Sequence, residues 1–162
     1  MKKPRLIAAA YGIALIAIAQ PPTSNVKELA PGVWVRFGNQ TRNQPANTGW
    51  VIFKDYVLVI DANYPWAAKE ILPEIRKTSN KPIRFVFNTH YHGDHAYGGS
   101  IFTGEGAQIV CSSDCAIESQ TKGQAGWDRN RAIEEFSLKP YKLALPFTHK
   151  DSGTYCTCLL YT

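Results

Sequence analysis

The 162-residue sequence lacks the features that mark several specialised classes of protein. It has no internal repeat and no low-complexity tract, and its 44% hydrophobic and 19% charged residues are ordinary values for a folded domain. No apolar run reaches the roughly 18 to 20 residues that a membrane-spanning helix needs. These absences exclude a disordered or fibrous chain, and we expect one compact domain.

Basic residues are scarce outside the N-terminus. Lys2, Lys3 and Arg5 supply three of the five excess positive charges, so the rest of the chain carries about +2. No run of lysine and arginine with interleaved aromatic residues occurs downstream. We therefore expect no nucleic-acid partner.

The first 19 residues have the composition of an export signal. Three basic residues precede the uncharged run LIAAAYGIALIAIA, which ends in the small-x-small pattern of residues 17–19. We predict a signal peptide over residues 1–19, cleaved after Ala19, and an exported protein that is periplasmic or secreted without a stable membrane anchor. An uncleaved anchor is the alternative, but the run lacks both the length and the stop-transfer flank that an anchor needs.

The chain has only four cysteines, which are Cys111, Cys115, Cys156 and Cys158. In an oxidising compartment they allow three disulfide pairings, among which the sequence does not choose. A local pair of Cys111 with Cys115 is favoured only if the turn between them is not a regular helix. The spacings CSSDC and CTC lack the two-residue gaps typical of zinc ribbons and redox pairs, so neither is expected.

The pattern of apolar residues predicts alternating strands and helices. GVWVRFG (residues 32–38) alternates like a half-buried strand, and a polar loop follows up to Gly49. WVIF and YVLVID predict a hairpin that turns at Lys54 and Asp55, with Asp61 at the end of its second strand. Residues 65–77 have the spacing of an amphipathic helix, in which Pro73 should produce a kink.

Further elements follow this helix. PIRFVFNT (residues 82–89) is nearly all apolar, which is typical of a strand buried on both faces. AQIVC (residues 107–111) predicts another strand, and residues 112–136 should be partly helical, interrupted by Gly123 and Gly126. This order of elements indicates an α/β or α+β layered domain.

Three of the four histidines lie in NTHYHGDHAYGG (residues 88–99), directly after an apolar strand. In an extended chain, side chains two apart point the same way, so His90 and His92 can bind one ion. A turn at Gly93 would direct Asp94 and His95 to a second point nearby. Imidazole and carboxylate without thiolate favour zinc, with iron or manganese as alternatives. The competing interpretations are an ordinary polar loop and a histidine cluster that binds metal without catalysis.

THYHGDHAYGG resembles the first metal motif of the metallo-β-lactamase-fold superfamily. NTGWVIFKDYVLVIDA and PEIRKTSNKPIRFVFNTH are similar to the strands and helix that precede that motif, so the resemblance covers about residues 32–136. It implies an αββα sandwich of which this chain holds the N-terminal half. It also implies that His90 and His92 hold one zinc, that Asp94 and His95 hold the other, and that Asp61 braces the site through hydrogen bonds.

The resemblance implies a hydrolase that acts on a small molecule carrying an ester, a thioester or an amide such as a β-lactam. Up to two zinc ions, or other divalent metals, would lower the pKa of bound water toward about 7. Asp94 would be catalytic as well as a ligand, because it can orient the attacking water. His95 at the last motif position is similar to the two-zinc branches that include glyoxalase II-like hydrolases and the third lactamase subclass.

Downstream, the sequence departs from the family. Only His149 remains as a histidine, in PFTHKDSG, which does not resemble the expected motif of the third ligand, and residues 137–162 form an atypical tail. We expect a fragment or frameshifted product of a longer hydrolase, with a metallo-β-lactamase-like domain over residues 20–162. The alternative is an exported metal-binding or dimerising module without catalysis, in which a homodimer completes the sandwich. A purely structural domain held by disulfides is a third possibility.

Overall fold

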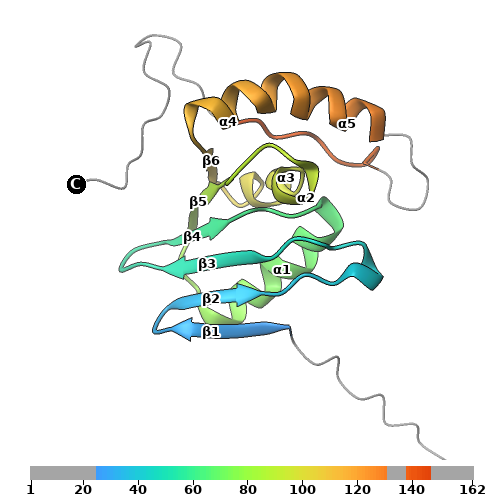
Figure 1. Ribbon diagram of the computed structural model, residues 1–162. Helices are drawn as coiled ribbons and strands as arrows, with labels where there is room; N and C mark the ends of the chain where they lie inside the picture. The colour runs from blue at the N-terminus through green and yellow to red at the C-terminus, as the bar shows by residue number, and fades with distance from the viewer. Residues whose placement is uncertain (1–24, 131–137, 147–162) are drawn as a thin grey trace, which may run out of the picture.

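The computed structural model describes residues 25–130 and 138–146. The predicted signal peptide, His149, Cys156 and Cys158 lie outside the described residues. One sheet has six strands that follow one another in chain order (Figure 1). They are β1 (Val26–Ala30), β2 (Val33–Arg36), β3 (Thr48–Ile52), β4 (Val57–Ile60), β5 (Ile83–Phe87) and β6 (Gln108–Val110).

The strands change direction halfway across the sheet. The first four are antiparallel to their neighbours, whereas β4, β5 and β6 are parallel. The crossovers are α1 (Pro65–Thr78) between β4 and β5, and α2 (Gly93–Ala96) with α3 (Gly99–Thr103) between β5 and β6. This mixed sheet with helices confirms the α/β fold class. It also brings the carboxyl ends of the three parallel strands to one edge, where ligands commonly bind.

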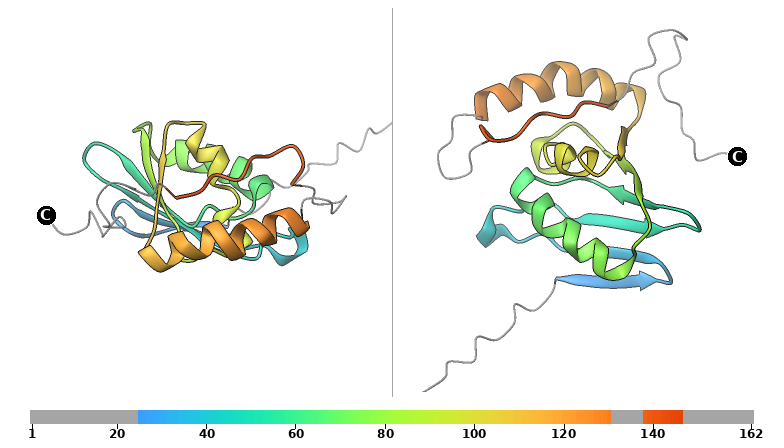
Figure 2. Two further views of the ribbon diagram at one scale, coloured as in Figure 1. Left: turned by 90° about the horizontal axis from the view of Figure 1, so that it is seen from above. Right: turned by 180° about the vertical axis from the view of Figure 1, so that it is seen from behind.

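Helix α1 lies across one face of the sheet (Figure 2). Pro65 stands at its start, where a missing N–H costs nothing, and Ala68, Ile71 and Ile75 are buried at helical spacing. The helix predicted for residues 65–77 is therefore confirmed and ends one residue later. Pro73 lies within it on an exposed position.

The two faces of the sheet differ in burial. Trp50, Val59 and Val86 point toward α1 and are fully buried in the main core. The next residues along the same strands, Leu58 and Phe87 among them, are only half-buried. The sequence predicted that the strand at residues 82–89 would be buried on both faces. Among the described residues only one face is fully buried, because the described helices of the crossovers pack on that side.

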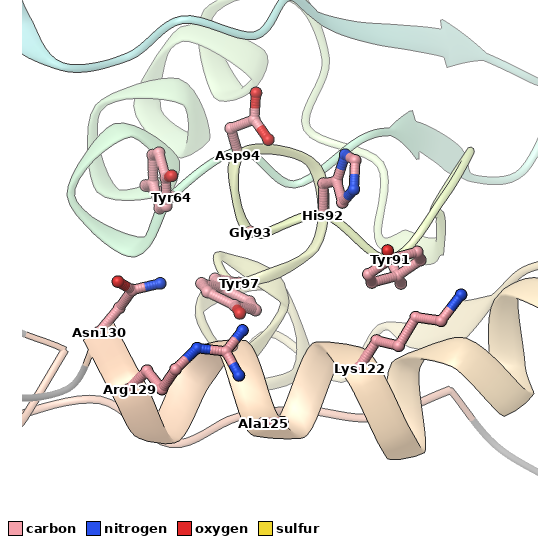
Figure 3. Close-up of a pocket in the computed structure, with 11 residues that line it drawn as sticks. Tyr64, Tyr91, His92, Gly93, Asp94, Tyr97, Lys122, Ala125, Arg129 and Asn130 are labelled. Carbon is pink, nitrogen blue, oxygen red and sulfur yellow. The ribbon is translucent and has the colours of Figure 1, made fainter.

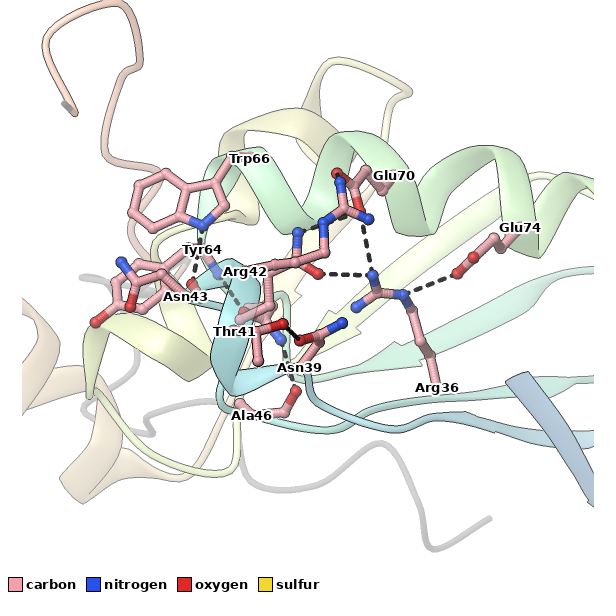
Figure 4. Close-up of polar contacts among 12 residues, drawn as sticks. Arg36, Asn39, Thr41, Arg42, Asn43, Ala46, Tyr64, Trp66, Glu70 and Glu74 are labelled. Atoms are coloured by element: carbon pink, nitrogen blue, oxygen red, sulfur yellow. Dashed lines mark hydrogen bonds and ion pairs between the residues drawn. The ribbon is translucent and has the colours of Figure 1, made fainter. Parts of the chain in front are cut away.

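A charged residue is also buried on the covered face (Figure 4). Arg36 of β2 is 5% exposed and forms ion pairs with Glu70 and Glu74 of α1, at 3.2 and 3.0 Å. It also donates a hydrogen bond to the side chain of Gln44, 2.7 Å away. Arg42 forms a further ion pair with Glu70. This network ties the loop after β2 to α1.

Two local predictions need correction, and one strand was not predicted. The polar loop before Gly49 contains a short 3-10 helix, Gln40–Arg42, and buries Gln44. Gly123 and Gly126 do not interrupt the helical segment after β6. It continues through α4 (Ser113–Glu118), the π-helical turn η2 (Ser119–Gly123) and α5 (Gln124–Asn130). Strand β1 went unpredicted because most of its side chains are exposed and so lack the alternating pattern of a half-buried strand.

Cys111 and Cys115 are buried together beside the end of β6. A hydrogen bond with Cys111 lowers the pKa of the Cys115 thiol to about 7, against the effect of burial. The Cys115 thiol also lies 3.8 Å from the backbone oxygen of Asn88. Across the described parts of the chain, no helix has the length and apolar character needed to cross a membrane.

Candidate metal centre

The predicted metal-binding residues lie together where β5 ends. His90 lies in the bend after the strand, His92 is the residue before α2, and Asp94 and His95 lie in that single helical turn. Asp61 directly follows the neighbouring strand β4. The parallel pairing of β4 with β5 therefore brings Asp61 beside a motif that follows it by about thirty positions.

Asp61 is held in an uncommon backbone conformation. Its φ is 61° and that of Asn63 is 59°, in the left-handed region that is more accessible to Asp and Asn than to most other residues. Backbone hydrogen bonds fix this turn, from Asp61 to the Phe87 carbonyl at 2.9 Å and from Ala62 to the His95 carbonyl at 2.6 Å. Such strained positions cluster at functional sites. The result is a carboxylate, 6% exposed, that faces the histidine loop.

Asp61 orients two of the histidines. It accepts a hydrogen bond from His95 Nδ1 at 2.8 Å, because a carboxylate without a proton can only accept. Its other contacts come from the backbone N–H and hydroxyl of Thr89, at 2.8 to 3.0 Å. The Thr89 hydroxyl has one proton, which it donates to Asp61. It therefore accepts a hydrogen bond from His90 Nδ1 at 3.0 Å. Both His90 and His95 are thereby left with Nε2 free to bind a ligand.

The histidine and carboxylate groups fit a metal as pairs. Two donor atoms on one tetrahedral zinc lie roughly 3.3 Å apart, and His95 Nε2 is 3.6 Å from Asp94 Oδ2. Two imidazole rings on one zinc have centroids roughly 5 Å apart by the same geometry, and those of His90 and His92 are 4.8 Å apart.

Three or more of these side chains are not arranged to bind one metal ion together within the described residues. The rings of His90 and His95 are only 4.0 Å apart. Within residues 25–130 and 138–146, no three histidine, cysteine or carboxylate side chains are arranged around one point. Each ion would thus take two ligands from this motif and need others from elsewhere.

The pKa values of two histidines move in opposite directions. Burial, and then the charges of His95 and His92, lower the pKa of His90 below the ordinary histidine value. The hydrogen bond to Asp61 raises the pKa of His95. A lowered pKa favours the neutral form of His90, which is the form that binds metal.

A pocket of about 580 Å³ opens beside the motif (Figure 3). His92, Gly93 and Asp94 line one side of it. The other walls come from three tyrosines and from the helical segment after β6, whose contributions include Lys122 and Arg129. This volume lies within the usual range for small-molecule sites.

Glycine makes the backbone packing behind the motif possible. A Cβ on Gly98 would lie 2.3 Å from the Ala62 carbonyl oxygen and 2.8 Å from the Ala68 side chain. The Gly98 N–H instead donates to the Asn63 carbonyl at 2.6 Å. A side chain at this position would push the histidine loop away from β4 and α1.

The sequence model of the metallo-beta-lactamase superfamily matches residues 41–110, which run from the loop after β2 to the end of β6. The matched residues include Asp61 and the whole histidine motif. Over these residues the chain is similar to the metallo-β-lactamase superfamily. A comparison with curated protein sequences found no match.

Solved metallo-β-lactamases share the fold of this chain. The enzyme from Pontibacter korlensis superposes with a TM-score of 0.54 at 22% identity, over 61% of this chain and 48% of that one. The enzyme from Hirschia baltica gives 0.53 at 22% identity, over 62% and 48%. FIM-1 from Pseudomonas aeruginosa, in its mono-zinc form, gives 0.52 at 22% identity, over 62% and 46%. The chain thus spans about half the length of these structures, and it corresponds to their N-terminal part.

Sequence reasoning identified the motif but not its surroundings. Thr89 lies within the motif, and its place in the sequence does not indicate that it connects His90 to Asp61. Lys122 and Arg129 were not singled out, because nothing local shows that the segment after β6 returns to the histidine loop. Only the length of that helical segment could have indicated that it reaches back to the histidine loop.

Proposed function

We propose that this protein is a zinc-dependent hydrolase in which His90 and His92 hold one ion and Asp94 and His95 hold a second. The observation that carries the proposal is the arrangement around Asp61. Directly and through Thr89, it holds two imidazoles by Nδ1 and leaves their Nε2 atoms free beside other donors. Buried carboxylates that orient metal-ligating histidines in this way are typical of zinc sites.

The superfamily and the mono-zinc form of FIM-1 support the choice of metal. When bound, zinc would polarise the carbonyl group of the substrate and lower the pKa of a water molecule toward about 7. Asp94 lies both beside His95 Nε2 and in the wall of the pocket, so its carboxylate would orient that water. The substrate would be a small molecule with an ester, a thioester or an amide such as a β-lactam. Export by the N-terminal segment belongs to the same proposal.

Substitution of a single ligand tests the proposal. His92→Ala should lower the zinc content of the purified chain, measured by mass spectrometry of the metal, and reduce ester hydrolysis by more than about 100-fold. Asp61→Asn should weaken zinc binding by about 10- to 100-fold without removing a ligand. The matched control is Asp55→Asn, which changes an exposed carboxylate at the β3–β4 turn. Turnover and zinc content that stay unchanged in His92→Ala would contradict the assignment.

The uncovered face of the sheet favours a second candidate, a metal-binding module that dimerises. In that case two copies would cover each other's apolar faces and each would supply ligands that the other lacks. Light scattering would then find a dimer that holds zinc only when assembled. A monomer that retains stoichiometric zinc would exclude this candidate and leave the first.

A further inference from the structure

The helical segment after β6 packs unusually closely against the histidine loop. A Cβ on Gly126 of α5 would lie 2.6 Å from the hydroxyl oxygen of Tyr97, so any larger residue there would have to displace the tyrosine. The same hydroxyl donates a hydrogen bond to the Gly123 carbonyl at 3.0 Å. Because of this contact, side chains on either side of Gly126 in the helical segment line the pocket beside His92 and Asp94 (Figure 3).

Two cationic side chains line this pocket from that helix. Lys122 lies in the π-helical turn and Arg129 near the end of α5, seven residues later. Seven residues make about two helical turns, so both side chains lie on the same side of the segment. π-Helical turns are rare and occur frequently at functional sites.

Arg129 has no hydrogen bond or ion pair to any other residue among those described. The adjacent Asp128 could have neutralised it, but that carboxylate accepts hydrogen bonds from Gln124 at 3.1 and 3.2 Å. The Arg129 guanidinium lies near the Tyr97 hydroxyl (Figure 3), since the two groups would be 3.9 and 2.6 Å from a Cβ on Gly126. Burial raises the pKa of Tyr97 to about 12, and the charge of Arg129 acts against this rise. The pocket therefore contains a cation without a partner in the described structure.

Lys122 is less available than Arg129. Its ammonium group forms an ion pair with Glu118, at 2.7 Å, one turn earlier in the helix. It also lies 5.6 Å from the ring centre of Tyr91, which lines the same pocket. Lys122 can add to the positive potential of the pocket, but Arg129 is the group with free donors.

We propose that Arg129 binds a carboxylate of the substrate, with Lys122 adding attraction, so that the enzyme acts on anionic esters, thioesters or amides. A guanidinium offers a planar pair of donors that matches a carboxylate and remains charged at every relevant pH. The negative charge of Asp94 in the same pocket would be neutralised when it binds zinc. This inference rests on the proposed function, because it assigns the substrate class of that site.

The test compares a charged substrate with its neutral analogue. The zinc-loaded chain is assayed with the mono-4-nitrophenyl ester of glutaric acid and with the methyl ester of that compound. In Arg129→Gln, the ratio of kcat/KM for the acid to kcat/KM for the neutral ester should fall by about tenfold or more, since hydrogen bonds to charged groups are worth that factor. Lys122→Gln should lower the ratio less.

Lys54→Gln is the control, because it removes one positive charge from the exposed β3–β4 turn and should leave the ratio unchanged. A ratio in Arg129→Gln equal to that of the unsubstituted chain would overturn the inference while leaving the hydrolase proposal intact. If neither ester is hydrolysed, the proposed function fails, and calorimetry with glutarate decides the inference separately. Glutarate binding that weakens about tenfold in Arg129→Gln would support the subsite, whereas equal or absent binding would overturn it.

Discussion

The two faces of the sheet carry apolar residues of the same kind but differ in burial. On β3 and β4, Trp50 and Val59 point toward α1 and are 0% exposed. Their neighbours Val51 and Leu58 point to the opposite side and are half-buried. Cross-strand pairing keeps the two sets apart, because Trp50 pairs with Val59 and Val51 pairs with Leu58.

Within the described residues, helices therefore cover one face of the sheet and leave the other face without a covering layer. The uncovered set runs across five strands and consists of Val33, Val35, Val51, Leu58, Ile60, Phe85, Phe87 and Val110. A contiguous apolar surface of this kind marks an interaction site or an aggregation risk in a soluble protein. The chain spans about half the length of the solved metallo-β-lactamases that it matches.

The largest expected effect concerns Arg36, whose charge is buried on the covered face. Arg36→Ala should destabilise the chain by about 3 kcal/mol, because it leaves Glu70 and Glu74 partly buried without their partner. Urea denaturation followed by circular dichroism measures this loss. Arg42→Ala is the control, since that side chain is 55% exposed and its ion pair should contribute less than about 1 kcal/mol. Equal losses of stability in the two variants would show that solvent reaches the Arg36 ion pairs as it reaches that of Arg42.

A smaller effect separates adjacent residues on β4. Val59→Ala should cost about 2 kcal/mol, because it removes two methyl groups from a closed core. Leu58→Ala removes more atoms but should cost less than about 1 kcal/mol, since its surroundings already include solvent. Thermal unfolding of the two variants compares these losses directly. If Leu58→Ala proved the more destabilising, something would cover that face in solution.

The smallest effect on stability, but the clearest on association, is expected from charges on the uncovered face. Val51→Lys combined with Leu58→Glu places an ion pair at cross-strand partners and should lower the mass found by light scattering toward that of a monomer. The exchange Lys54→Asp with Asp55→Lys alters charges at the exposed turn as a control. A monomeric unsubstituted chain at all concentrations would remove the reason for this expectation.

Much of the fold could be predicted because local patterns determine it. The hairpin with its turn at Lys54 and Asp55 followed from two apolar runs, and α1 followed from Pro65 and the spacing of its buried residues. The continuous helix through Gly123 and Gly126 was not predicted, because glycine locally disfavours helix. Gly126 lies close to Tyr97, a residue far away in sequence, and this contact favours glycine at that position despite its low helix propensity.

The site could be predicted only in its contiguous part. The histidine motif is a local string, and the role of Asp61 came from a family resemblance. The contact between Thr89 and Asp61 depends on the pairing of β4 with β5, which sets the two strand ends side by side. Arg36 alternates like any strand residue, and nothing local reveals that two carboxylates of a later helix surround it.

The position of Ile60 and Phe87 links the sheet to the site. These two residues are cross-strand partners on the uncovered face, one residue before Asp61 and three residues before His90. A layer that shields this pair from water would therefore reach close to the histidines. If such a layer supplies ligands to the proposed metal site, coverage of this face and metal affinity are thermodynamically linked, and each raises the other. The zinc affinity measured by titration would then indicate whether the apolar face of the sheet is covered.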